Sequence, residues 1–214
     1  MTQTETTTRQ ARRDKNRDKL IEATLDTIAQ QGISGTSVSA IIERANLSRG
    51  MIHLHFGGKD NLISEAARHS SEVYFSNLES ALARPGSSAE EKISAVINND
   101  LSAAVLNERS VRIWYAFRGE SRNHAKIGSY SDTRDDRLRE MMFLAFEEIV
   151  QTMNYSDVAV VSRDATHGTL ALLEGMWTDY LLHPKSFNRD SAKRIIFRFL
   201  GALFPLNFSE DGPN

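Results

Sequence analysis

Apolar residues recur every three or four positions along most of this 214-residue chain, a spacing that places them on one face of an α-helix. No segment shows the two-residue alternation of a half-buried β-strand. The spacing predicts helices over residues 21–29, 38–45, 49–55, 59–82, 89–105, 108–120, 132–153, 157–182 and 190–203. The chain is therefore predicted to be all-α.

Residues 36–62 combine two short helices, a tight polar turn and the start of a longer helix. Val38, Ile41 and Ala45 share one face of the first short helix. Ser48 is expected to cap the second, because a serine hydroxyl there accepts a backbone N–H from the first turn. Two short helices joined by a short turn form the layout of a DNA-reading helix-turn-helix, which we place over about residues 37–56.

The second short helix, over residues 49–55, carries an unusual set of residues for a surface that faces only solvent. At 100° per residue, Ile52 points inward, whereas Gly50, His53 and Leu54 point outward. Glycine costs a helix about 1 kcal/mol relative to alanine, so a glycine here favours close approach of a partner to the backbone. The alternative is an ordinary three-helix hairpin with a solvent-exposed helix.

Residues 14–74 resemble the N-terminal domain of the TetR family of one-component repressors. The resemblance rests on Gly32, Thr36-Ser37-Val38, Ile41, Ala45, Leu47-Ser48, Gly50, Ile52, His55-Phe56, Lys59 and Leu62. It implies specific DNA binding as a dimer, altered by a small ligand. The candidate DNA-binding residues are Thr36, Ser37, Ser48, Arg49, Gly50, Met51, His53, Leu54, His55 and Lys59. The family often has tyrosine where this chain has His53 and Leu54; His53 keeps a donor for a phosphate, and Leu54 does not.

The charge distribution gives weak support to a nucleic-acid partner. The net charge is −2, but residues 1–62 hold nine Lys or Arg against seven Asp or Glu, and six of the nine lie between Arg9 and Lys19. The threonine-rich start predicts a disordered N-terminal arm over residues 1–13. Its arginines, Arg9, Arg12 and Arg13, either enter a minor groove of DNA or form a solvated leader.

Other function classes find little support. The chain has no cysteine, so we expect neither disulfides nor a thiolate metal site. The six histidines form neither HExxH nor Glu-x-x-His, and no glycine-rich phosphate loop or G-x-S-x-G motif occurs, so we expect no enzyme, metal or cofactor. No apolar run suits a signal peptide or a membrane span, so a cytoplasmic protein with no membrane partner is expected.

Residues 75–206 are predicted to form a helical domain for ligand binding and dimerisation, with a flexible tail over residues 207–214. In the resembled family, the last two long helices of each subunit form a four-helix dimer interface. The candidate interface residues are Leu170, Leu173, Leu181, Ile195, Phe199 and Leu203. A dimer would hold two reading helices about 34–36 Å apart, one helical turn of DNA. The alternative is that these apolar stripes are intramolecular core.

Two groups of aromatic residues in this domain are candidates for ligand contact. The candidate residues are Trp114, Phe117, Arg118, Glu174, Trp177 and Tyr180. Aromatic faces beside a carboxylate suit a quaternary ammonium ion, although aromatic residues at helical spacing also occur in ordinary cores. Residues 114–117 and 172–177 resemble the C-terminal domain of the BetI subgroup, which includes a choline-responsive repressor. Arg118 would repel a cation, so a betaine or a carboxylate is the other ligand class.

Together these features predict a ligand-responsive transcriptional repressor. It would bind double-stranded operator DNA of palindromic sequence as a homodimer and be released by a small molecule such as choline or a betaine. The alternative is a helical small-molecule-binding dimer that does not recognise a DNA sequence.

Overall fold

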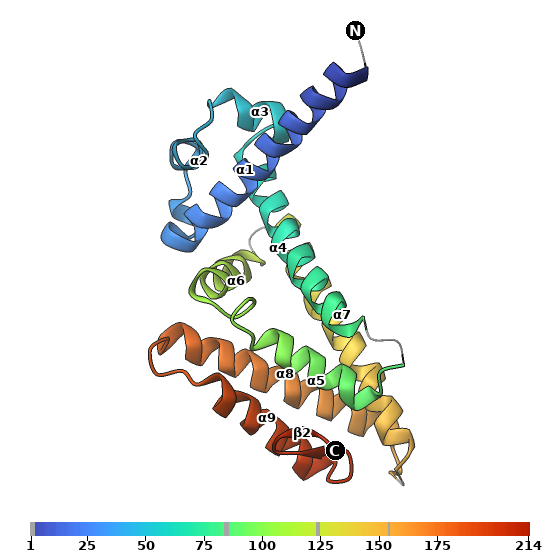
Figure 1. The fold of residues 1–214 in the computed structure, drawn as a ribbon. Coiled ribbons are helices and arrows are strands. Elements are labelled where there is room, and N and C mark those ends of the chain that lie inside the picture. The colour runs from blue at the N-terminus through green and yellow to red at the C-terminus, as the bar shows by residue number, and fades with distance from the viewer. Residues whose placement is uncertain (1–2, 84–85, 123–124, 154) are drawn as a thin grey trace. The chain divides into compact units, whose positions relative to one another are not determined.

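The computed structural model describes residues 3–83, 86–122, 125–153 and 155–214. Along these residues the chain is helical apart from turns and one pair of two-residue strands, which confirms the all-α fold class (Figure 1). The chain divides into two compact units: unit 1 is Met1–Glu72 with Arg112–Ser131, and unit 2 is Val73–Val111 with Asp132–Asn214. No helix within the described ranges combines the length and apolar character needed to cross a bilayer.

Nine helices and two strands make up the described part of the chain. In chain order they are α1 (Gln3–Gly35), α2 (Val38–Ala45), α3 (Gly50–Phe56), α4 (Lys59–Leu82), α5 (Ala89–Asp100), α6 (Glu108–Glu120), α7 (Ala125–Gln151), α8 (Val158–Leu182), α9 (Arg189–Leu203), β1 (Phe208–Ser209) and β2 (Gly212–Pro213). A unit boundary lies within α4, close to the domain boundary that the sequence predicts at residue 74. The segment 112–131 differs from that prediction, because it belongs to unit 1.

The core of unit 1 explains why this segment joins it. Residues of α1, α2, α3 and the start of α4 form one apolar cluster, and α6 and the start of α7 add side chains to it. Its largest members are Leu20, Ile21, Ile28, Ile41, Ile52, Leu62, Ile113, Phe117 and Ile127. A small domain buries only a limited apolar area, so the side chains added by α6 and α7 give unit 1 a larger core.

Residues with a positive φ angle separate the first helices of unit 1. Gly32 (φ 70°) interrupts α1 near its end, Asn46 (φ 51°) closes α2, and Gly57 (φ 75°) closes α3. Glycine and asparagine tolerate this left-handed conformation better than other residues. These turns fix the directions in which α2 and α3 leave the chain.

The N-terminus differs from the expected disordered arm, because α1 begins at Gln3. No glycine or proline precedes Gly32, and the good helix formers Gln10, Ala11 and Arg12 follow the threonine-rich start. Gln10 donates a hydrogen bond to Asp14 one turn later, at 2.9 Å. The sequence therefore supports a helix that continues beyond the core.

In unit 2, local sequence signals and long-range packing both determine helix ends. Ser88 and Glu91 form a capping box, with Ser88 N–H donating to Glu91 at 2.9 Å and Glu91 N–H donating to Ser88 Oγ at 3.2 Å. α5 ends at Asp100, not near Val105 as the periodicity predicts. The helices α8 and α9 pack closely, because a Cβ on Gly168 would lie 2.7 Å from the ring of Phe199.

The C-terminal residues are not the flexible tail that the sequence predicts. β1 and β2 pair in an antiparallel manner, with Phe208 opposite Pro213. Phe208 is buried, and the Asn207 amide donates to Glu90 of α5 at 2.6 Å. An apolar anchor and a hydrogen bond to another helix together hold this segment against unit 2.

Candidate functional site

The turn between α2 and α3 has a well-defined local geometry. Ser37 caps α2, since its hydroxyl accepts a hydrogen bond from the Ala40 N–H at 3.1 Å. At the other end, Asn46 is left-handed, and the Leu47 N–H donates to the Ile42 carbonyl at 3.1 Å. The turn therefore satisfies backbone groups at the end of α2 before α3 begins.

The outer face of α3 is open along its length. Ile52 is buried in the core of unit 1, whereas Gly50, His53 and Leu54 are exposed, as the helical spacing predicts. Leu54 is 63% exposed, which is high for a leucine. A Cβ added at Gly50 would meet no atom within 4 Å, so the fold itself does not require glycine there.

The start of α3 corrects one prediction. Ser48 does not act as the side-chain cap, because Arg49 occupies the N-cap position with helical φ/ψ angles and no side-chain cap is present. Ser48 contributes its backbone carbonyl, which accepts from the Met51 N–H at 3.0 Å. Both Ser48 and Arg49 are exposed, so their side chains are available to a partner.

Two further candidates support the turn before α2 instead of lying on the open surface. Thr36 is buried, and its hydroxyl donates to the Gly32 carbonyl at 2.7 Å. Lys59 is half-buried, and its ammonium donates to the Thr36 carbonyl at 3.2 Å. The side chain of Thr36 therefore faces the interior, and Lys59 ties the start of α4 to the loop before α2.

His55 lies at the contact between α3 and α1. Its Nε2 atom is buried and has no hydrogen-bond partner. Burial lowers the pKa of His55 below its ordinary value of 6.5, and the nearby cations Arg13 and Arg17 of α1 lower it further, against a smaller opposing effect of Asp14. The neutral imidazole is therefore favoured in the folded protein.

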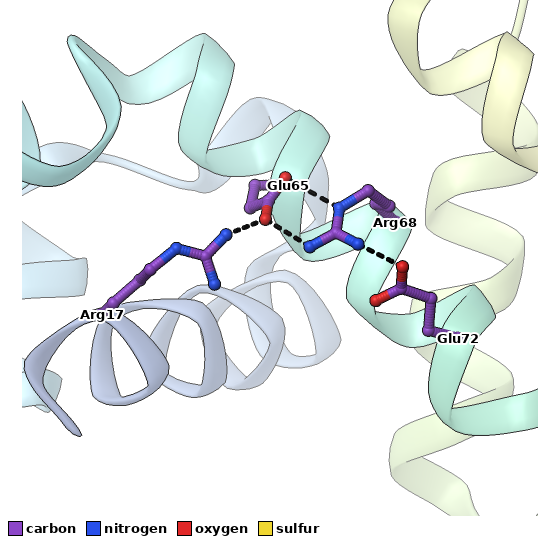
Figure 2. A network of polar contacts seen from close by, with 4 residues as sticks. All are labelled: Arg17, Glu65, Arg68 and Glu72. Atoms are coloured by element: carbon purple, nitrogen blue, oxygen red, sulfur yellow. Dashed lines mark hydrogen bonds and ion pairs between the residues drawn. The ribbon is translucent and has the colours of Figure 1, made fainter. Parts of the chain in front are cut away.

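A network of charges that the sequence analysis misses connects α1 with α4 (Figure 2). Arg17 forms an ion pair with Glu65, and its guanidinium lies 5.5 Å from the ring centroid of Phe56 at the end of α3. Arg68 donates to both carboxylate oxygens of Glu65, at 2.6 and 3.0 Å, and also pairs with Glu72. The spacing of residues 65, 68 and 72 predicts pairs along α4, but nothing local predicts Arg17 as their partner.

The six candidate ligand residues divide between the two units. Trp114, Phe117 and Arg118 belong to unit 1. Phe117 is buried in the core of that unit, among the apolar cluster described above. The guanidinium of Arg118 lies 5.2 Å from the ring centroid of Trp114, so the ring already has a cation as a neighbour.

One candidate of unit 2, Trp177, contacts a buried carboxylate that sequence reasoning does not find. Asp100, at the end of α5, is 4% exposed. It accepts a hydrogen bond from the Trp177 indole at 2.8 Å and another from the Tyr74 hydroxyl at 2.9 Å. Glu174 is half-buried on the same helix as Trp177. Asp100 is thus a buried acid that accepts hydrogen bonds from both an indole and a phenol group.

Arg189 organises the neighbouring turn. It donates to the carbonyls of Leu101 and Leu106, at 2.9 and 2.7 Å. Its guanidinium lies 5.3 Å from the ring centroid of Tyr180, and Tyr180 also meets the ring of Phe187 edge-on at 5.4 Å. The ring of Tyr180 is thus part of a packed aromatic and cationic cluster.

The candidate dimer residues differ in exposure. Leu173 is buried within unit 2, so its side chain belongs to the core. Ile195 is 50% exposed on α9, and Leu203 is also exposed. Leu170, Leu181 and Phe199 are half-buried.

Among the described residues, no cluster of three or more His, Asp or Glu side chains is placed to hold a metal ion.

Two family models match most of the chain. Residues 20–66 match the model described as "Bacterial regulatory proteins, tetR family", and residues 89–205 match "BetI-type transcriptional repressor, C-terminal". Curated relatives named "HTH-type transcriptional regulator BetI" occur in Vibrio atlanticus and Paraburkholderia phytofirmans. The Vibrio protein is 26% identical over 188 residues, 87% of this chain and 90% of the relative. The Paraburkholderia protein is 27% identical over 187 residues, 86% of this chain and 90% of the relative.

Solved structures share the fold. A protein from Pseudomonas aeruginosa PAO1, described as a transcriptional regulator, is 26% identical with a TM-score of 0.80, covering 90% of this chain and 91% of that chain. A second, from Saccharomonospora viridis, was solved in complex with choline. It is 19% identical with a TM-score of 0.75, covering 87% of this chain and 96% of that chain. The proteins and families matched here are transcriptional regulators, not enzymes.

Proposed function

Because this chain belongs to the TetR family of transcriptional regulators and has a BetI-type C-terminal domain, we propose that it is a repressor of adjacent genes. It binds a palindromic operator as a homodimer in the cytoplasm, and a small-molecule effector releases it. The α3 helices of the two subunits enter successive major grooves of the DNA.

The exposed face of α3 carries this proposal. Gly50 leaves the backbone open at the start of the helix, and Arg49 and His53 beside it offer hydrogen-bond donors. Leu54 exposes an apolar side chain that suits the methyl group of thymine. In a free helix, an exposed glycine lowers stability and an exposed leucine adds none. Both residues are favourable where the helix contacts the edges of DNA bases.

The substitution Gly50→Ala separates folding from DNA recognition. Since a Cβ there meets no protein atom, alanine should leave stability unchanged or raise it by up to about 1 kcal/mol. The added methyl group would meet DNA, so affinity for the operator should fall at least about tenfold, a loss of about 1.4 kcal/mol. Gly119→Ala in α6 is the matched control, because Gly119 is also exposed, helical and open around its Cβ.

The assay is a gel shift with the DNA upstream of the protein's own gene, with a melting curve for each variant. Binding by wild type and Gly119→Ala, with weak binding by a folded Gly50→Ala, supports the proposal. If the wild-type protein binds neither this DNA nor a randomised pool at low salt, the result favours the alternative, a small-molecule-binding helical dimer. Equal binding of the operator by all three proteins would contradict the proposal that α3 enters the major groove.

For the effector we propose choline, a betaine or a related small metabolite. The BetI-type match and a structural relative solved with choline support this class. In unit 2, Trp177 and Glu174 lie on one helix and offer an aromatic ring and a carboxylate for an ammonium group. Titrating choline and glycine betaine separately into the protein–DNA complex distinguishes a cation from a zwitterion, because only the true effector releases the DNA at saturating concentration.

A further inference from the structure

The N-terminal part of α1 has a different character from the part that enters the core. Leu20, Thr24 and Ile28 point into unit 1 and are buried. At 100° per residue, Arg13 and Asn16 lie within roughly 40° of Leu20 on the same helix face. The face that is apolar in the core therefore becomes cationic and polar where the helix continues past it.

This cationic face lies beside the reading helix. In unit 1 the N-terminal part of α1 runs past α3 (Figure 1). Arg12, Arg13 and Asn16 line a groove of about 370 Å³ together with Leu54 and His55 of α3. The outer face of α3 and the basic turns of α1 thus form one continuous surface.

The arginines of this surface are available to an anion. Among the described residues neither Arg12 nor Arg13 has a carboxylate at salt-bridge distance, and both are exposed. Arg17, one turn further along, differs because Glu65 and Phe56 already occupy it. The charge of Arg13 reaches α3, since it contributes to the lowered pKa of His55.

We propose that Arg12 and Arg13 on the N-terminal turns of α1 bind the phosphate backbone of the strand that borders the groove entered by α3. This inference rests on the proposed DNA-binding function and adds a second contact element to it. Guanidinium groups bind phosphates strongly, and such contacts add affinity and orientation without reading sequence. Six Lys or Arg lie between Arg9 and Lys19, although the net charge of the whole chain is −2.

The test compares Arg13→Ala with Lys15→Ala on the same helix. Lys15 is also exposed and carries the same charge, but its side chain leaves the helix in a direction about 160° from that of Arg13. The DNA probe is a labelled duplex that carries the site selected by the wild-type protein from a randomised pool, with a scrambled duplex as the second probe. Affinities are measured over a series of salt concentrations, and melting curves verify folding.

Each phosphate contact contributes about 0.9 to the slope of log K against log salt, or about eightfold in affinity at 0.1 M salt. A dimer loses two contacts per substitution. Arg13→Ala should therefore reduce the slope by about 1.8 and weaken both duplexes by roughly sixtyfold, and Arg12→Ala should act similarly. Lys15→Ala should leave the slope unchanged, and Arg13→Lys should retain most of the affinity.

Each possible result either supports or overturns the proposed phosphate contact. A selective effect of Arg12→Ala and Arg13→Ala on both duplexes supports the proposal. Equal losses of affinity in Arg13→Ala and Lys15→Ala would indicate non-specific electrostatic attraction. An unchanged salt slope in the arginine variants would show that α1 does not contact the DNA. Either result overturns this proposal but not the proposed function. If wild-type protein selects no site from the pool, the proposed function fails first.

Discussion

Tyr74→Phe removes one donor from the buried carboxylate of Asp100 and leaves the packing almost unchanged. Tyr74 is 6% exposed, and its hydroxyl donates to Asp100 Oδ1 at 2.9 Å. Phenylalanine keeps the ring, including its edge-on contact with Phe75 at 5.3 Å. The change therefore isolates the hydrogen bond from the hydrophobic contribution of the ring.

The expected loss of stability depends on the environment of the hydrogen bond between Tyr74 and Asp100. A hydrogen bond to a charged group contributes about 1.5–3 kcal/mol, and burial on both sides keeps water from replacing the lost donor. For a chain of this size, 1 kcal/mol corresponds to about 2–4 °C in melting temperature. Tyr74→Phe should therefore lower the melting temperature by roughly 3–12 °C.

Thermal denaturation followed by circular dichroism at one fixed protein concentration measures the shift, because the melting temperature of the proposed dimer would depend on protein concentration. Tyr155→Phe is the matched control: Tyr155 is 43% exposed, so the same chemical change should alter stability by less than about 0.5 kcal/mol. A shift in Tyr74→Phe no larger than that of the control would refute the idea that the Asp100 bond stabilises unit 2.

Three further outcomes test other parts of the structure. Gly128→Ala should destabilise unit 1 by about 1–3 kcal/mol, since its Cβ would lie 2.5 Å from the Ser121 carbonyl oxygen. Gly119→Ala should not destabilise it, because a Cβ there meets no atom. Equal melting temperatures of the two variants would contradict the close contact between Gly128 and Ser121. Because the pKa of His55 is lowered in the folded protein, the unfolded chain gains a proton at higher pH than the folded one. The free energy of unfolding should therefore decrease as pH falls below 6.5. Urea titrations at several pH values should show a weaker dependence of this free energy on pH in His55→Gln. Ile195→Lys should shift a dimer toward monomer in sedimentation, and an unchanged mass would exclude that part of α9 from the interface.

Short-range features of the fold are predictable from the sequence. The capping box of Ser88 and Glu91 depends on residues three positions apart, and both hydrogen bonds are present. The inward position of Ile52 and the outward position of Leu54 follow from helical spacing alone. Ser48 shows the limit of such reasoning, because its suitability as a cap did not decide where α3 begins.

Features that depend on distant residues could not be predicted. α5 ends at Asp100 where periodicity predicts a longer helix, and Arg189, far along the chain, binds the carbonyls of the turn that follows. The hydrogen bond between Trp177 and Asp100 joins residues 77 positions apart, and the ion pair between Arg17 and Glu65 joins residues 48 apart. Phe117 resembles any aromatic residue on a helix until its neighbours are known.

The sequence by itself determined the helical class, the helix-turn-helix and the family, because these depend on periodicity, turn residues and a dense local motif. Only the tertiary structure decided which aromatic side chains are core, that 112–131 joins the first unit, and that the basic start of α1 lies beside α3. The physical reason is that side-chain periodicity specifies which face of a helix is apolar, whereas the neighbour that covers this face is specified only by packing of the whole chain.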